Sequence, residues 1–292
     1  MADVFIAGMA ALDLVFRLDD LPRGEGKYRA GAATMVGGGC AANAAVAVAR
    51  LGGGVRLAAR LGRDRGAELI LSALRAEGVG LDHVCCEAAA TTPFSSIVIA
   101  PEGARQIVNF RGAAPGPRAH FDALPARCDV ALADTRWRAG LRQTIRSARA
   151  CRLPVVVDAE APVSPQDIAG ATHVAFSRPG LEAICPGMRV GAGLRRVAAL
   201  TGAWVCVTDG AAGVHFLDGD AVKNIPAVPV RAVDTLGAGD VWHGAFALRL
   251  GEGAPEREAM RFANAAAALK CTRHGGGAGA PGRDEVERLL TT

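Results

Sequence analysis

Short runs of consecutive apolar residues recur along this chain, and each is followed by a longer stretch in which apolar and polar residues are mixed. The first run spans residues 4–10. Further strand-length segments, rich in apolar residues but with some polar ones, lie at residues 55–61, 129–134, 154–158, 173–177 and 204–208. Uninterrupted apolar runs of this length are typical of strands buried on both faces. Their alternation with helical stretches predicts a parallel sheet wrapped by helices.

Two of the intervening stretches have clear helix signals. Residues 44–51 are rich in alanine and end at the glycines 52–54, where a helix C-cap is expected. A second helix is expected at residues 65–76. Later in the chain, residues 214–217 and 222–230 have the pattern of an extended pair at the edge of the sheet.

Two segments, at about residues 14–36 and 94–112, interrupt this alternation with short strand-like pieces. In the second segment, two such pieces flank residues 101–104 as the strands of a β-hairpin would. Two strand-rich insertions of this kind predict a small β-sheet lid that excludes water from a site. We therefore expect a single α/β domain over residues 1–292, with helices on both faces of a parallel sheet and this lid beside it.

The composition narrows the class of protein. Half of the 292 residues are hydrophobic, and 33 basic against 29 acidic residues give a net charge of only +4. Because there is no run of basic residues, we expect no nucleic-acid partner. No apolar stretch approaches the length of a membrane span, and residues 1–11 lack the pattern of a signal peptide, so we expect a cytoplasmic protein without a membrane partner.

The eight cysteines do not indicate a metal site or a disulfide framework, because none of them forms a C-x-x-C pair. Most are expected to be buried, reduced core residues. Cys40 lies in a glycine-rich stretch and is a candidate for lining a pocket.

The strongest chemical signal is the stretch 233–240, which leads into an apolar helical segment. The turn Gly237-Ala238-Gly239 opens this helix, so backbone N–H groups and the positive end of the helix dipole converge where a phosphate could bind. Asp240 follows in the first turn and could take a proton from an attacking hydroxyl, as phosphoryl transfer requires. The alternative is an ordinary glycine turn with Asp as a helix cap.

Other polar residues lie at positions suited to a ligand. Asp13 follows the first apolar run, where the carboxyl end of a strand would meet a substrate; the alternative is a plain loop residue. Asn43 lies among small residues and needs a partner for its amide, either a structural bond or a sugar hydroxyl. The glycine loop at residues 275–279 could offer carbonyl groups to a monovalent cation, or be a simple surface loop.

Residues 37–54 and 234–244 resemble the two signatures of the ribokinase, or PfkB, family of carbohydrate kinases, and the resemblance extends over nearly the whole chain. It implies a ribokinase-like fold and transfer of the γ-phosphate of ATP to a sugar hydroxyl. The catalytic residues would be Asp240 as the base, with Gly237, Ala238 and Gly239 as the anion hole. The sugar would be held by Asp13, Gly38, Gly39 and Asn43.

The same resemblance implies the sites for nucleotide and metals. ATP would lie over Thr208, Asp209 and Gly210, with Asn264 near the adenine, and Mg²⁺ would arrive with ATP. Asp234 and the carbonyl of Leu236, with carbonyls after Arg273, would bind a monovalent cation such as K⁺. One family motif is missing, because the stretch 177–182 reads Ser-Arg-Pro-Gly-Leu-Glu where many members have Asn-x-x-Glu.

Several shorter pieces are similar to the 6-deoxy-6-sulfofructose kinases within this family. They are residues 26–28, 108–110, 133–137, 175–181 and 268–273. Lys27, Asn109 and Arg136 could then converge on the anionic end of a sugar. The alternative is that Lys27 is a solvated lid residue and Arg136 a structural partner of Asp134.

The sequence therefore predicts an ATP-dependent sugar kinase, with 6-deoxy-6-sulfofructose as the first choice of substrate. Fructose, fructose 6-phosphate, 2-keto-3-deoxygluconate or a nucleoside are the alternatives, and a nucleotide-binding sensor without catalysis is the alternative of another class. A dehydrogenase is disfavoured, since no G-x-G-x-x-G follows the first strand. Exposed lid edges also predict a homodimer through residues 15–36.

Overall fold

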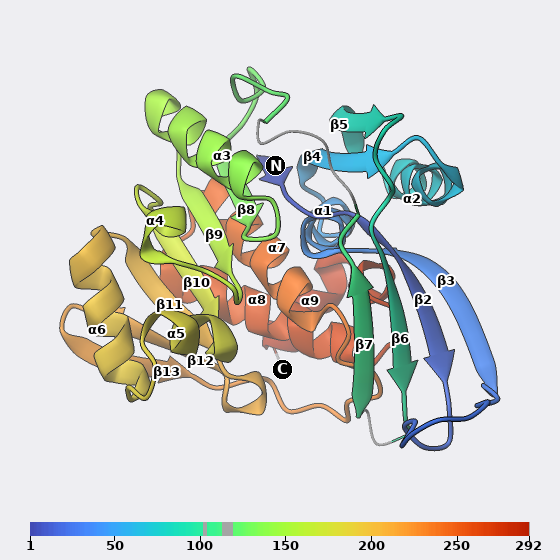
Figure 1. Cartoon of the computed structure of the whole chain (residues 1–292). Helices are drawn as coiled ribbons and strands as arrows, with labels where there is room; N and C mark the ends of the chain where they lie inside the picture. The colour runs from blue at the N-terminus through green and yellow to red at the C-terminus, as the bar shows by residue number, and fades with distance from the viewer. Residues whose placement is uncertain (102–103, 113–118, 292) are drawn as a thin grey trace.

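The computed structural model describes residues 1–101, 104–112 and 119–291, and its largest element is a nine-stranded sheet (Figure 1). The strand order is β13-β12-β11-β10-β9-β8-β1-β4-β5. All neighbours are parallel except β11 with β12 and β12 with β13. The strands are β1 (Asp3–Ala7), β4 (Gly54–Gly62), β5 (Gly80–Glu87), β8 (Val130–Asp134), β9 (Val155–Ala159), β10 (His173–Ser177), β11 (Trp204–Thr208), β12 (Val214–Asp218) and β13 (Ala221–Ile225).

Helices cover both faces of this sheet, because successive side chains of a strand point to opposite faces. In β1, Val4 and Ile6 enter one hydrophobic core, whereas Phe5 and Ala7 enter the other. The first core is closed by α1 (Cys40–Arg50), α2 (Arg65–Ala76), α7 (Ala238–Gly251), α8 (Glu256–Cys271) and α9 (Arg283–Thr291). The second is closed by α3 (Arg138–Cys151), α4 (Pro165–Ile168), α5 (Arg178–Ile184) and α6 (Val190–Thr201).

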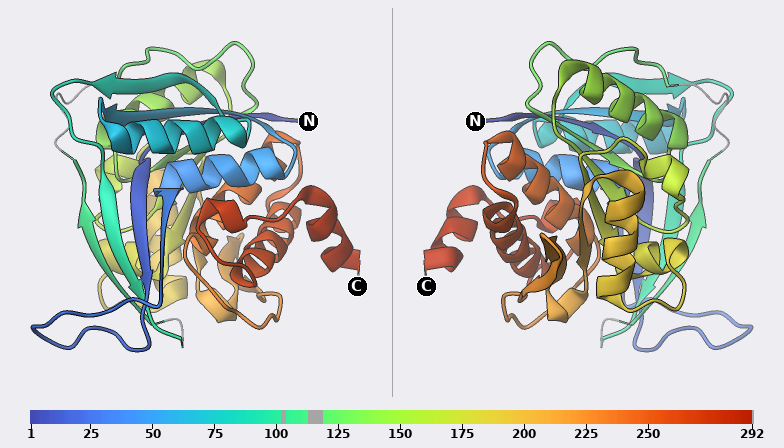
Figure 2. Two further views of the ribbon diagram at one scale, coloured as in Figure 1. Left: turned by 90° about the vertical axis from the view of Figure 1, so that its right-hand side faces the viewer. Right: turned by 90° about the vertical axis from the view of Figure 1, so that its left-hand side faces the viewer.

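A separate four-stranded sheet lies beside the large sheet (Figures 1 and 2). Its order is β3-β2-β6-β7, with strands β3 (Ala32–Gly38), β2 (Ala11–Arg17), β6 (Phe94–Ile99) and β7 (Arg105–Phe110). Val15, Ile97 and Ile99 pack on one face of it together with Leu236, which precedes α7. That face is therefore the inner one, turned toward the N-terminus of α7.

This architecture confirms the predicted fold class of a largely parallel sheet with helices on both faces and a small β-sheet lid. The helix expected at residues 65–76 has those bounds in the structure, and the alanine-rich helix begins earlier than expected, at Cys40. The strand expected at residues 222–230 ends at Ile225, because Pro226 cannot donate a hydrogen bond to a neighbouring strand. Residues 102–103, in the expected hairpin turn, lie outside the described residues.

Two further expectations need correction. Asp13 lies inside β2 of the small sheet and not in a loop after the first strand, because β1 ends at Ala7 and the chain changes sheet there. Of the eight cysteines, all unpaired, only Cys185 and Cys206 are buried, so the expectation that most are core residues is wrong. Among the helices described, none combines the length and apolar character needed to cross a membrane.

Candidate active site

The carboxylate of Asp240 lies in the first turn of α7, at the edge where the parallel strands of the large sheet end. Desolvation is the main reason that the pKa of Asp240 is raised to about 7, and the nearby charge of Asp158 raises it further. A hydrogen bond from Asn43 acts in the opposite direction. Asp240 can therefore exchange a proton near neutral pH, which suits a general base.

The turn before Asp240 exposes the N-terminus of the helix. Gly237 is the N-cap residue, with φ of 74°, a conformation that glycine adopts at little cost. Ala238 donates its N–H to the carbonyl of Thr235 at 3.3 Å. The N–H groups of the first turn have no partner within the helix, so Gly239 presents an N–H at the open end, where an anion would be stabilised.

Asn43 uses both ends of its amide inside the protein. Its Nδ2 donates to Asp240 Oδ2 at 2.7 Å, and its Oδ1 accepts from the N–H of Gly277 at 2.8 Å. The second bond holds the glycine loop around the 3₁₀ turn η2 (Gly277–Gly279) against α1. The structural bond considered for Asn43 is therefore present, and a contact with a sugar hydroxyl stays a prediction.

Asp13, Gly38 and Gly39 come together on the lid side of the site. A Cβ atom on Gly38 would overlap the carboxylate of Asp13, so only glycine permits this approach. Gly39 has a φ of 91° and a side chain there would overlap the backbone of Met9. Burial raises the pKa of Asp13 to about 6, against a lowering hydrogen bond from Ser95.

A cavity of about 670 Å³ opens on the other side of the α7 N-terminus. Its volume is in the range of small-molecule sites. Thr208, Gly210, Ala238, Gly239 and Asn264 are among its lining residues, so it reaches from the end of β11 to the glycine turn that opens α7. Asp209 does not line it among the described residues and instead faces Arg178 and His215, at 3.5 and 3.8 Å.

The same cavity contains residues that the sequence analysis missed. Trp242 lines it, and its indole N–H donates to Asn264 Oδ1 at 2.8 Å. Asn264 Nδ2 in turn donates to the carbonyl of Pro226 at 3.0 Å, so its amide is engaged within the protein. Arg105 lines the cavity from the small sheet and donates to Thr235 Oγ1 at 3.2 Å. The only sequence signal for Arg105 was its position as a basic residue at the start of an expected lid strand.

A series of ionisable groups extends from Asp240 toward the C-terminal end of β8. Ligand atoms of Asp240, Asp158 and Cys40 all lie within 4.8 Å of one another. Cys40 Sγ is 4.0 Å from Glu160 Oε2, and Glu160 pairs with the Arg136 guanidinium. Arg136 also donates to the carbonyl of Ala161 at 2.6 Å.

Asp134 contacts the backbone and not the guanidinium of Arg136. Its carboxylate accepts from the N–H groups of Met9, Ala41 and Arg136 at 2.7, 3.2 and 2.9 Å. Asp134 therefore joins the end of β1 to α1 and is a structural partner of Arg136 through the main chain, whereas the guanidinium of Arg136 pairs with Glu160.

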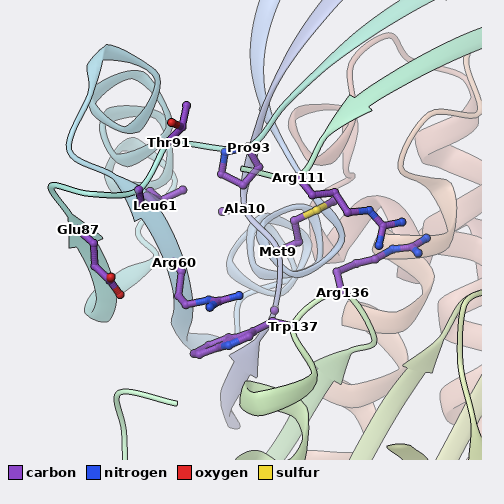
Figure 3. Close-up of a pocket in the computed structure, with 12 residues that line it drawn as sticks. Met9, Ala10, Arg60, Leu61, Glu87, Thr91, Pro93, Arg111, Arg136 and Trp137 are labelled. Carbon is purple, nitrogen blue, oxygen red and sulfur yellow. The ribbon is translucent and has the colours of Figure 1, made fainter. Parts of the chain in front are cut away.

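Arg136 lines a small pocket together with two further arginines, Arg60 and Arg111 (Figure 3). Arg60 lies over the ring of Trp137, with the guanidinium carbon 5.2 Å from the ring centroid. The side chains of Arg111 and Arg136 come from opposite walls and point the same way beside Met9 (Figure 3). Arg111 is another residue that the sequence analysis did not single out.

Asn109 and Lys27, the other two residues expected to bind the anionic end of a sugar, lie in different parts of the lid. Asn109 pairs with Ser95 and Ser95 with Asp13 in the strand register, so the three side chains share the inner face of the small sheet. Lys27 is exposed on the β2–β3 connection, which projects away from the large sheet (Figure 2). The structure therefore brings Asn109 to the site side of the lid and does not bring Lys27 there.

Asp158 is the carboxylate best suited to the magnesium that accompanies ATP. It is buried, faces the site, and receives no hydrogen bond from the residues that the structure describes; His243 Nε2 lies 3.5 Å from its Oδ1, and burial lowers the pKa of His243. Carboxylate oxygens are preferred Mg²⁺ ligands, directly or through water. Glu182, which follows the missing motif, instead accepts from the N–H of Gly187 at 2.7 Å.

The residues expected to hold a monovalent cation are close together but already bonded. Asp234 Oδ1 accepts from the N–H of Leu236 at 2.9 Å, and Oδ2 accepts from the N–H of Gly275 at 3.0 Å. The backbone carbonyl of Asp234 accepts from Lys270 Nζ at 2.8 Å. Lys270 was not predicted as part of this site.

A carboxylate beside an open helix N-terminus, next to a cavity of this volume, is the arrangement that transfer of a phosphoryl group to an alcohol requires. The chain belongs to the pfkB family of carbohydrate kinases, whose sequence model matches residues 1–283. Members of this family are sugar kinases that use ATP.

Individual relatives agree with this assignment over the whole chain. The chain is 31% identical to the ribokinase of Bacillus subtilis over 299 residues, which cover 100% of both proteins. A crystal structure from Agrobacterium tumefaciens, provisionally described as a ribokinase, has 34% identity and a TM-score of 0.91 over 99% of this chain and 97% of the other. The Arabidopsis thaliana ribokinase, solved with ribose and ATP, has the same fold, with a TM-score of 0.86 at 23% identity over 100% of both chains.

Proposed function

We propose that this kinase phosphorylates a primary hydroxyl of an anionic ketose, with 6-deoxy-6-sulfofructose as its preferred substrate. The observation that carries the proposal is the pair of guanidinium groups of Arg111 and Arg136, which point the same way beside Met9 (Figure 3). Planar guanidinium groups bind sulfonate or phosphate oxygens through paired, charge-assisted hydrogen bonds.

The arginines and Asp240 belong to one continuous series of neighbouring side chains, which supports a single substrate that contacts both. Arg136 pairs with Glu160, Glu160 approaches Cys40, and Cys40 approaches Asp240. A ketose whose charged end meets Arg111 and Arg136 would present the hydroxyl at its other end to Asp240.

In this proposal Asp240 takes the proton of the attacking hydroxyl, and the N–H groups of Gly237 and Gly239 at the start of α7 hold the charge of the transferred group. Asp13 and Asn109 face the sugar from the lid. ATP occupies the cavity that Thr208, Gly210 and Asn264 line. Asp158 would hold the accompanying Mg²⁺, which neutralises phosphate charge when bound.

A neutral sugar such as ribose or fructose is the second candidate, and one observation favours it. Glu160 pairs with Arg136, so part of the positive charge at this end of the pocket is compensated. The name of the Bacillus subtilis relative points to ribose as well. Arg111 distinguishes the two candidates. No ion-pair partner for it is found within the described ranges, so its positive charge is available to an anionic sugar.

The deciding experiment is ADP release from MgATP over a panel of neutral, phosphorylated and sulfonated ketoses. We expect the highest kcat/KM with the sulfonated ketose. Arg111→Gln should raise KM for that sugar by roughly ten- to a hundredfold, because a charge-assisted hydrogen bond to the sugar is lost. Arg146→Gln, an exposed change on α3, is the matched control. Turnover confined to ribose or fructose, unaffected by Arg111→Gln, would assign the neutral sugar.

We also propose that residues 1–292 form one domain and that two copies pair through the lid. The side chains of Met35, Phe94, Val108 and Phe110 are large, apolar and exposed. In the strand register they lie on the face opposite Asp13, turned away from the large sheet. Light scattering that gives the mass of a single chain at micromolar concentration would exclude the dimer, and Val108→Glu should convert a dimer to a monomer.

A further inference from the structure

Lys270 is a buried cation at the end of α8, with a fully inaccessible side chain. Its ammonium group faces three oxygens. They are the backbone carbonyl of Asp234 at 2.8 Å, the carbonyl of Arg273 at 3.5 Å and the Asp234 carboxylate at 3.8 Å. A buried ammonium is stable only when oxygen partners of this kind replace its water.

These oxygens belong to the two segments expected to bind a monovalent cation, the turn after Asp234 and the loop after Arg273. K⁺ needs several carbonyl or carboxylate oxygens that are free to replace its water. Here the Asp234 carboxylate already faces Lys270, the Arg17 guanidinium at 3.6 Å and two backbone N–H groups. The residues present therefore do not fit an additional cation beside Asp234.

We propose that the ammonium group of Lys270 takes the place of a monovalent cation, so that this kinase works without K⁺. Lys270 is a positioning residue in this role. It holds the backbone of Asp234, three residues before the anion-binding turn at Gly237. The carbonyl of Cys271 anchors the same segment by accepting from the N–H groups of Val233 and Asp234 at 2.8 and 3.1 Å.

The proposal rests on the kinase activity of the family and not on the identity of the sugar. Two readouts test it in the wild-type protein at constant ionic strength, with KCl replaced by choline chloride. We expect kcat to change by less than about twofold, and Tm to be the same in both salts, because a ligand raises Tm only where it binds the folded state. Clear activation by KCl, or a higher Tm in KCl, would overturn the proposal. The comparison of Tm in the two salts tests the proposal even if none of the sugars is a substrate.

Lys270→Ala opens the position to an external ion. In choline chloride its kcat should fall by about tenfold or more, because a charge-assisted contact is lost. KCl or NH₄Cl should restore activity and raise Tm of this variant in a saturable way, which a purely structural role would not produce. If Lys270→Ala does not fold, Lys270→Met is the replacement. Lys223→Met, an exposed change on β13, should behave as the wild type. A folded Lys270 variant whose kcat and Tm ignore both ions would overturn the proposal.

Discussion

Asn43 donates a hydrogen bond of 2.7 Å from Nδ2 to Oδ2 of Asp240, although the two residues are 197 positions apart in the chain. The same side chain accepts from Gly277 at 2.8 Å. One amide from α1 thus orients the carboxylate at the start of α7 and holds the glycine loop after α8. The site depends on this link between its two halves.

We predict that Asn43→Ala lowers kcat by roughly ten- to a hundredfold, because Asp240 loses a hydrogen bond to its charged form and its orientation. Nucleotide affinity should change little, since Asn43 does not line the large cavity. Steady-state kinetics with ADP binding by calorimetry checks this. Unchanged kcat in a folded variant would show that Asp240 is oriented by other contacts.

Replacement of the base itself should be more severe. Asp240→Asn keeps the shape of the side chain but cannot accept a proton, so kcat should fall by roughly 10²–10⁴-fold. ADP should still bind, which the fluorescence of Trp242 in the cavity can report. Asp284→Asn on α9 serves as the exposed control. Turnover at the wild-type rate would exclude Asp240 as the base.

Arg105 is expected to contact the phosphates of ATP from the lid, because it lines the nucleotide cavity beside Thr235. Arg105→Gln should raise KM for ATP by roughly tenfold or more, the effect of a lost charge-assisted hydrogen bond. Arg261→Gln, an exposed change on α8, is the matched control. An equal rise of KM for the sugar and for ATP would contradict a specific contact with ATP and would indicate that Arg105 holds the lid against the rest of the protein.

The pH dependence of sugar binding should follow Asp13. Its pKa is raised to about 6, so the carboxylate is ionised above pH 6 and protonated below it. The ionised form accepts stronger hydrogen bonds from hydroxyl groups, so KM for the sugar should rise as the pH falls through 6. In Asp13→Asn this dependence should disappear, with KM uniformly high. A wild-type KM that stays constant from about one pH unit below this pKa to about two units above it would contradict a role for Asp13.

Gly237→Ala tests the anion-binding turn against a matched glycine. Both Gly237 and Gly253 have positive φ, at 74° and 83°, so alanine at either should cost about 1–3 kcal/mol of stability. A Cβ on Gly237 would also lie 3.0 Å from Gly276, whereas one on Gly253 meets nothing within 4 Å. Thermal unfolding should therefore show a loss in both, and kcat should fall only for Gly237→Ala. If kcat is the same in the two variants, the turn at Gly237 has no role in catalysis.

Local patterns in the sequence were sufficient for the fold class and for the position of Asp240. Apolar runs such as residues 173–177 are buried on both faces, and that requirement can be read without knowing their neighbours. The strand Gly80–Glu87, which mixes polar and apolar residues, was not predicted. It lies at the edge of the sheet and therefore needs no continuous apolar run.

The chain by itself therefore determined most of the buried strands and the helix at residues 65–76, and that a glycine turn with an Asp opens a helix. Tertiary structure alone decided which side chains come together: Asn43 contacts Asp240, Lys270 contacts Asp234, and Arg111 and Arg136 line one pocket. These pairs join residues distant in sequence, and their contacts depend on strand order, register and helix packing. Lys270 illustrates the reason most clearly, because an apolar, alanine-rich helix predicts a buried position but does not say which oxygens will surround the charge placed there.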